Sequence, residues 1–298
     1  MNRIRVLLVN VNGLNSQCKR DRLRLKASNF DFIILTETHW TDETDCSQID
    51  AMLPEHLVVH CAGTHKEPGA RGSNGVAIAC SRQIDKDRIT HIPTEDGRLL
   101  IVRVHMPTLQ TEPLVIVAVY APTEPAKRVK WLKDSLPLIR SMKSRNMIVA
   151  GDFNCVQMVS LDRDPVPKVS YNSLRGSVEI SRWQHELNLT DYWRESNPTK
   201  RVFTYWRGEG AKKISSRLDY IFLSRDLAQV CTSIEIEKHG ISDHAFLTCS
   251  LDLDCRARGN KAKSYWKLNT KLLDDEIVKA QVGCVLRAYR DLQDNSAG

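Results

Sequence analysis

Residues 148–154 have the sequence Ile-Val-Ala-Gly-Asp-Phe-Asn, and this stretch limits the possible fold more than any other part of the chain. The apolar residues Ile148 and Val149 suit a strand that is covered on both faces, and Gly151 lets the backbone turn sharply. Asp152 and Asn154 would then lie at the carboxyl edge of that strand, where α/β sheets present their chemistry. The stretch therefore predicts an α/β fold with polar side chains gathered at one sheet edge.

Polar residues mark the ends of several other apolar runs. Asn12 follows the first run of the chain and Glu37 follows the second. Asp219 interrupts a later run, where a buried carboxylate needs a charged partner. Asp243 and His244 precede the last run, so Asp219 is a natural orienting partner for His244. Carboxylates, an amide and a histidine that converge on one sheet edge predict metal-assisted hydrolysis.

Each of these residues also has an ordinary structural explanation. Asn12 followed by Gly13 is a common turn signal, and an acid such as Glu37 after four apolar residues often simply meets solvent. A hard oxygen ligand for Mg²⁺ is the sharper interpretation of Glu37. Tyr120 ends another apolar run, and it is either a core residue or a hydroxyl directed at the same edge as Asp152.

Composition sets broader limits. The 298 residues are 42% hydrophobic, which is enough for one main core, and 43 basic against 36 acidic residues give a net charge of +7. This charge mildly favours a polyanionic partner, although an ordinary basic protein fits it equally well. The nine cysteines are scattered and never form C-x-x-C, which predicts free thiols in a reducing compartment. No apolar run reaches about 18 residues, so we expect no membrane association and a cytosolic or nuclear location.

The chain divides at about residue 255. Residues 1–255 are expected to form one domain, because their apolar runs alternate with polar connections throughout. Residues 256–298 begin with a basic linker and continue into an amphipathic stretch, which we interpret as the start of a downstream region.

Within the domain, local patterns predict several elements. Residues 99–105 and 114–120 are dense in apolar residues and predict an antiparallel pair. Residues 124–143 predict a helix with a kink or an early stop at Pro137. Ser16 is a candidate cap for the helix that follows it.

Six short motifs occur in order between residues 10 and 244: Asn-x-Asn-Gly-Leu, Thr-Glu-Thr-His, Tyr-Ala-Pro, Gly-Asp-Phe-Asn, Arg-Leu-Asp-Tyr and Ser-Asp-His. Together they resemble the endonuclease/exonuclease/phosphatase superfamily. Within it, the Leu-Asp-Arg at 161–163 and the trailing Tyr-Trp-Lys-Leu-Asn at 265–269 are similar to the apurinic-endonuclease-like N-terminal endonucleases of LINE-type non-LTR retrotransposons.

The resemblance implies a fold and an activity. The fold would be an α/β sandwich of the DNase I-like kind, with four layers in which two packed mixed β-sheets are flanked by helices. The enzyme would nick one strand of duplex DNA in the nucleus and leave a 3′-hydroxyl for the reverse transcriptase region of the same polyprotein to extend. Mg²⁺, with Mn²⁺ as a possible substitute, would be the cofactor.

The resemblance also implies roles for residues. Glu37 would hold the metal with help from Asn12 and Asp243. Asp152 and Asn154 would position or deprotonate the attacking water. His244, held by Asp219, would stabilise the developing charge. The remaining candidates are substrate contacts: Tyr120, Thr204, Ser242, Arg163, Arg71, Lys212 and Lys213.

Three alternatives stay open. Apurinic repair endonucleases share the motifs, but they carry an aspartate where Asn12 stands and an aromatic residue where this chain has Ser216, and both differences favour the retrotransposon group. A catalytically inactive relative that only binds nucleic acid is the second alternative. A phosphatase acting on inositol lipids is the third.

Overall fold

The computed structural model describes residues 2–14, 16–41, 46–63, 73–109, 112–167 and 171–254, together with 279, 282 and 283. Arg71, one of the predicted DNA contacts, lies outside these residues. The predicted linker and almost all of the predicted downstream region at 256–298 also lie outside them.

The first sheet has six strands in the order β14-β15-β1-β2-β4-β3. Their bounds are β1 Arg3–Asn10, β2 Phe32–Thr36, β3 His56–Cys61, β4 Val76–Ser81, β14 Cys231–Glu237 and β15 Phe246–Asp252. β1 and β2 are parallel, and the other neighbouring pairs in this sheet are antiparallel.

The second sheet also has six strands, in the order β10-β13-β8-β7-β6-β5. Their bounds are β5 Ile89–Pro93, β6 Leu99–Val104, β7 Leu114–Tyr120, β8 Asn146–Asp152, β10 Leu189–Thr190 and β13 Asp219–Ser224. β7 and β8 are parallel, and the predicted antiparallel pairing of β6 with β7 is confirmed. A small third sheet contains β11 Tyr205–Arg207, β12 Ile214–Ser216 and β9 Arg163–Asp164.

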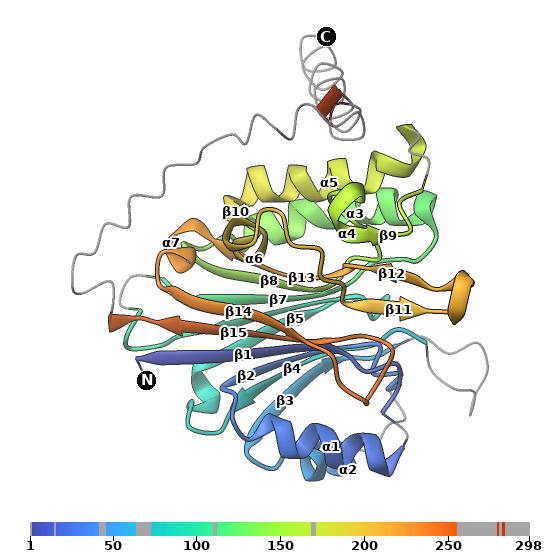
Figure 1. Cartoon of the computed structure of the whole chain (residues 1–298). Helices are drawn as coiled ribbons and strands as arrows, with labels where there is room; N and C mark the ends of the chain where they lie inside the picture. The colour runs from blue at the N-terminus through green and yellow to red at the C-terminus, as the bar shows by residue number, and fades with distance from the viewer. Residues whose placement is uncertain are drawn as a thin grey trace.

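Helices cover the outer faces of the two large sheets (Figure 1). The first sheet carries α1 Gln17–Ala27 and α2 Cys46–Met52, and the second carries α3 Pro125–Ser141 and α5 Tyr171–Leu187. Shorter helices lie in the connections: α4 Val159–Asp162, α6 Tyr192–Ser196, α7 Arg225–Ala228, and the 3₁₀ turns η1 Lys86–Arg88 and η2 Gly210–Lys212. The predicted four-layer α/β sandwich is therefore confirmed.

Strand alternation explains the layers. In β1, Ile4, Val6 and Leu8 pack in the core between the two sheets, whereas Leu7 and Val9 pack beneath α1 and α2. Both faces of the strand are buried, so its sequence is apolar almost throughout. The other central strands follow the same rule, and a polar residue within them stands out.

The early stop predicted at Pro137 and the side-chain cap predicted at Ser16 are not found, and the alternative of a kink at Pro137 stays a prediction. α3 continues through Pro137 to Ser141, because Leu136 and Ile139 on either side of the proline are buried in the core beneath the helix. Ser16 makes no side-chain capping bond to α1.

In the part of the chain that the structure describes, no helix is long and apolar enough to cross a membrane.

Candidate active site

The ends of the central strands meet at one edge of the sandwich. The parallel strands β7 and β8 end side by side at Tyr120 and Asp152, which are partners in register. The antiparallel strand β13 begins at the same place, with Asp219 opposite Asp152. On the first sheet, β1 ends at Asn10 and Glu37 follows β2 directly. Contacts across the two sheets then join these residues into one cluster.

Asn10 lies at the centre of the cluster, and the sequence analysis did not identify it. Its side chain is fully buried and its amide nitrogen donates to Glu37 Oε1 at 2.9 Å and to Asp152 Oδ2 at 3.0 Å. A signal was present in the sequence, because Asn10 continues the series of alternate residues Ile4, Val6 and Leu8 that face the space between the sheets. A polar residue at the next position of a buried face needs a specific partner.

Glu37 is held as a carboxylate. Its backbone is left-handed, with a φ of 53°, which directs the chain out of β2 and into the site. Burial raises the pKa of the Glu37 carboxyl, but hydrogen bonds from His39, Asn10 and Tyr120 outweigh it and lower the pKa to about 2. Glu37 is thus ionised at any physiological pH and can serve as a metal ligand.

His244 and Asp219 form the predicted pair. His244 Nδ1 lies 2.8 Å from Asp219 Oδ2, and both side chains are buried. Burial disfavours the charged ring, but Asp219, assisted by Asp152 and Asp243, raises the pKa of His244 to about 10. His244 Nε2 lies 3.9 Å from Asp152 Oδ2, so a charged imidazolium directs a second donor into the cluster.

Asp152 and Asn154 form the turn after β8. Burial, together with the nearby charge of Asp219, raises the pKa of Asp152. Asp152 Oδ1 accepts the backbone N–H of Asn154 at 2.8 Å, and the Asn154 side-chain nitrogen donates to the carbonyl of Ala121 at 2.9 Å. The side-chain oxygen of Asn154 is therefore the atom left for a ligand.

The donor set suits a hard divalent cation. Ligand atoms of Asp152, Asp219 and His244 all lie within 4.8 Å of one another, and Asp219 Oδ1 is buried without a hydrogen-bond partner. Two buried carboxylates side by side, with Glu37 as a third nearby, leave negative charge that a cation would neutralise. Carboxylate and amide oxygens are the ligands that Mg²⁺ and Mn²⁺ prefer. These residues therefore fit the predicted metal.

Asn12 and Asp243 lie at the rim of the site. Both are exposed, and the Asn12 amide donates to Asp243 Oδ1 at 3.3 Å. The Asn12 backbone N–H also donates to Asn10 Oδ1 at 3.0 Å, which joins this rim to the buried cluster. Their predicted role as metal ligands stays a prediction.

Thr204 and Ser242 have their hydroxyl groups committed within the protein. Thr204 is fully buried, and its hydroxyl oxygen accepts the backbone N–H groups of Leu218 and Asp219. The Ser242 hydroxyl donates to the carbonyl of Asn10 at 2.6 Å and accepts the N–H of His244. These hydrogen bonds position residues of the cluster. A direct contact of Thr204 or Ser242 with substrate stays a prediction.

The predicted basic contacts lie on the third sheet. Lys212 and Lys213 are exposed on the connection between β11 and β12, and Arg163 is half-buried in β9. The same sheet reaches the cluster through Tyr205, whose ring lies 4.8 Å from that of His244. The hairpin therefore extends from the catalytic edge into solvent.

A buried ion cluster holds the third sheet in place. Arg217 donates to Asp162 Oδ1 at 2.8 Å and Oδ2 at 3.2 Å, and its third nitrogen donates to Asp191 at 2.7 Å. Arg194 also donates to Asp162. Because Arg217 and Asp162 are at most 2% exposed, this cluster joins the segment that carries Arg163 rigidly to the one that leads into β13.

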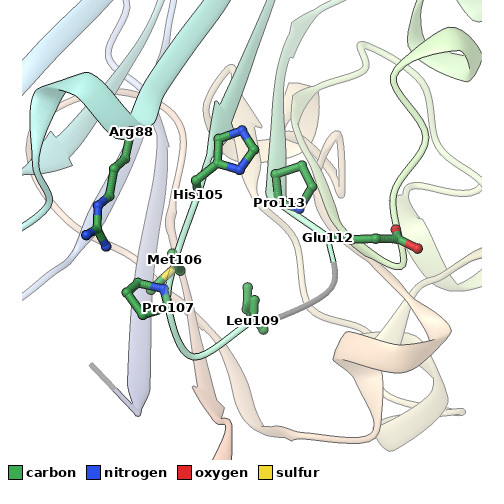
Figure 2. Close-up of a pocket in the computed structure, with 7 residues that line it drawn as sticks. All are labelled: Arg88, His105, Met106, Pro107, Leu109, Glu112 and Pro113. Atoms are coloured by element: carbon green, nitrogen blue, oxygen red, sulfur yellow. The ribbon is translucent and has the colours of Figure 1, made fainter.

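A cavity of about 450 Å³ lies at the opposite end of the second sheet (Figure 2). It is lined by residues around the connection from β6 to β7, among them Arg88, His105, Leu109 and Glu112. β7 runs from this end towards Tyr120, so the cavity is separate from the polar cluster.

Two transposon proteins are similar in sequence. The Transposon TX1 uncharacterized 149 kDa protein of Xenopus laevis is 27% identical over 274 residues, which are 92% of this chain. The RNA-directed DNA polymerase from mobile element jockey of Drosophila melanogaster is 26% identical over 151 residues, which are 51% of this chain. This chain covers only 20% and 15% of the lengths of those proteins.

Solved structures share the fold. The AP endonuclease LMAP from Leishmania major superposes with a TM-score of 0.69 at 18% identity, covering 84% of this chain and 88% of that one. The endonuclease domain of TRAS1, a telomere-specific non-LTR retrotransposon, superposes with a TM-score of 0.57 at 17% identity, covering 83% and 98%. The predicted resemblance to retrotransposon proteins is confirmed. The model of the Endonuclease/Exonuclease/phosphatase family matches residues 7–244, and the chain therefore belongs to this family.

Proposed function

We propose that this chain is a Mg²⁺-dependent endonuclease that nicks one strand of duplex DNA and leaves a 3′-hydroxyl end. That end would prime reverse transcription by a downstream region of the same polyprotein, in the nucleus. The observation that carries the proposal is the buried cluster of Asn10, Glu37, Asp152, Asp219 and His244, which combines hard oxygen ligands with a charged donor.

The relatives support the biological setting. One of them is named as an RNA-directed DNA polymerase of a mobile element, and another protein of the same fold is the endonuclease domain of a non-LTR retrotransposon. The net charge of +7 is consistent with a polyanionic substrate.

The residues of the cluster divide the work of hydrolysis. Asp152, whose pKa is raised by burial, accepts a proton from the attacking water, and the Asn154 oxygen orients that water. His244, kept charged by Asp219, donates a hydrogen bond to the oxygen on which negative charge grows. Tyr120 remains neutral, because burial and the charges of Glu37 and Asp152 raise its pKa, so it acts as a donor.

Glu37 would hold the metal ion together with the predicted rim ligands Asn12 and Asp243, while the Asn10 amide nitrogen would orient the Glu37 carboxylate. When bound, Mg²⁺ would act as a Lewis acid that polarises the phosphate. Mn²⁺ would be expected to substitute, because it takes the same oxygen ligands.

Substrate choice separates this proposal from a repair activity. Ser216 is buried beside β11 and β9, and its small side chain cannot form an aromatic wall for a flipped sugar. We therefore propose that the enzyme acts on intact duplex and positions it through phosphate contacts from Arg163, Lys212 and Lys213.

Digestion of supercoiled plasmid and matched duplexes tests the proposal. We expect Mg²⁺-dependent conversion to nicked circles, 3′-hydroxyl ends that a polymerase extends, and little gain from a single abasic site. Cleavage hundreds-fold faster at the abasic site, with intact DNA untouched, would place the chain with the repair enzymes. Binding to duplex without any nicking, in either metal, would indicate an inactive binding protein.

A further inference from the structure

Arg98 lies beside the active site, although none of the motifs includes it. In β6, Leu100, Val102 and Val104 face the core between the two sheets. Arg98 precedes the strand by one residue and continues this alternation. Its side chain is therefore directed into the space between the sheets, at the edge where Tyr120 lies.

The guanidinium of Arg98 stacks on Tyr120. Its central carbon lies 5.0 Å from the centre of the Tyr120 ring, and Nη1 donates to the Tyr120 carbonyl at 3.2 Å. The backbones are joined as well, since Tyr120 N–H donates to the Arg98 carbonyl at 2.8 Å. The cation over the ring and the directed hydrogen bond together restrain both the ring and the backbone of Tyr120.

The turn before Arg98 is itself fixed. Asp96 Oδ1 accepts the N–H of Arg98 at 3.1 Å, while Oδ2 accepts the Trp131 indole N–H at 2.7 Å. Gly97 has a φ of 65°, and a side chain there would lie 2.3 Å from the carbonyl of Ala62. This close approach locks the turn against the first sheet, so Arg98 has little freedom to move.

Tyr120 passes this constraint to the metal site. It ends β7 opposite Asp152, and its hydroxyl is close enough to help lower the pKa of the Glu37 carboxyl, one of the groups that would hold a cation. A ring free to tilt would release that hydroxyl, and Glu37 would lose one of the contacts that orient it. Residues that hydrogen-bond to a metal ligand set the orientation of that ligand and the affinity of the site for the metal.

We propose that Arg98 is a positioning residue that clamps Tyr120 so that its hydroxyl orients Glu37 for metal binding. This inference rests on the proposed metal-dependent nuclease function and deepens it. It assigns to Arg98 an effect on metal affinity and on turnover, rather than a simple contact with DNA.

The test compares Arg98→Gln and Arg98→Lys with Tyr120→Phe and with a control, Arg88→Gln. Arg88 is exposed and lines the cavity at the far end of the second sheet (Figure 2), so the control removes one positive charge without touching the site. Mn²⁺ binding is measured by electron paramagnetic resonance without DNA, and nicking kinetics are measured separately. Circular dichroism confirms that each variant is folded.

We expect Arg98→Gln to weaken Mn²⁺ binding and to lower kcat by about tenfold each, with KM for duplex nearly unchanged. Arg98→Lys should be intermediate, because it keeps the charge but not the planar stack. Arg98→Gln should add little to Tyr120→Phe, since both break the same chain of contacts.

Three results would overturn the inference: Mn²⁺ binding equal to that of Arg88→Gln, a raised KM with unchanged kcat, or full additivity with Tyr120→Phe. The binding measurement keeps the two proposals apart. A wild-type protein that binds Mn²⁺ but cuts no DNA would refute the proposed function, while the effect of Arg98 on binding would still be decided.

Discussion

Replacing Asp219 by asparagine tests the central pair of the site. The substitution keeps the size of the side chain but removes the charge that lies 2.8 Å from His244 Nδ1. In the wild type, the surrounding carboxylates overcome burial and raise the pKa of His244 from 6.5 to about 10. Since a tenfold change in proton affinity corresponds to about 1.4 kcal/mol, they stabilise the charged ring by roughly 5 kcal/mol net of burial.

Asp219 is the largest favourable contribution to this balance. We expect Asp219→Asn to lower the pKa of His244 by about 3 pH units, because burial then acts against only the more distant charges of Asp152 and Asp243. The ring would be neutral at pH 8, and nicking at that pH would fall about 100-fold through loss of a charged donor. The loss should be much smaller at pH 6, where most of the imidazole rings would still be protonated.

The assay is a pH titration of the His244 imidazole by NMR in metal-free protein, beside a pH profile of nicking. Asp134→Asn is the matched control, because Asp134 is exposed on α3 and is not among the charges that raise the pKa of His244. A His244 pKa that stays near 10 in Asp219→Asn, or a loss of nicking that is the same at pH 6 and pH 8, would refute the reasoning.

The same pair makes folding stability depend on pH. The folded pKa of His244 is above the unfolded value, so its contribution is fully present below about pH 6.5 and is lost as pH rises towards 10. Urea unfolding of the wild type should therefore show a decline in stability over this range, and Asp219→Asn should show a smaller one.

Further predictions concern other parts of the site. Glu37→Ala and Asp152→Ala should each lower Mg²⁺-dependent nicking by about 10²- to 10³-fold with unchanged circular dichroism, and near-wild-type nicking would remove the residue from the site. Asn10→Ala should weaken nicking by a similar amount and also lower the unfolding midpoint in urea, since it leaves two buried carboxylates without a donor. Replacing Lys212 and Lys213 together by alanine should reduce the salt dependence of duplex binding by a slope of up to about 2 while leaving metal binding intact, and an unchanged slope would exclude them as phosphate contacts.

Much of the architecture could be predicted from strand patterns. Runs such as residues 114–119 and 147–150 are apolar on both faces, so each needs a covering layer on both sides. β5 was not predicted, because it is an edge strand whose residues are mostly exposed, so its sequence lacks an apolar run. Runs of apolar residues in a sequence therefore identify the central strands of a sheet far better than its edge strands.

The site was predictable where a polar residue breaks an apolar run or follows it. Asp219 and Glu37 were found in this way, and Asp219 indeed lies against His244. Asn10 was not predicted as a site residue. Asn12, two residues later and followed by Gly13, was selected instead as the polar residue that ends the first apolar run. Arg98 could not be found from its neighbours in sequence, since its importance comes from Tyr120 on the adjacent strand.

The buried ion cluster around Arg217 and Asp162 separates the part of the hairpin that can change in sequence from the part that must stay fixed. The cluster anchors the base of the β11–β12 hairpin, whereas Lys212 and Lys213 at its tip are exposed and a side chain added at Gly210 would meet no atom within 4 Å. If the proposed function holds, substitutions at the tip would therefore alter the contacts with DNA without moving Asp219. Such a chain could acquire a new target site by exchanging a few residues of one loop, while its chemistry is inherited unchanged.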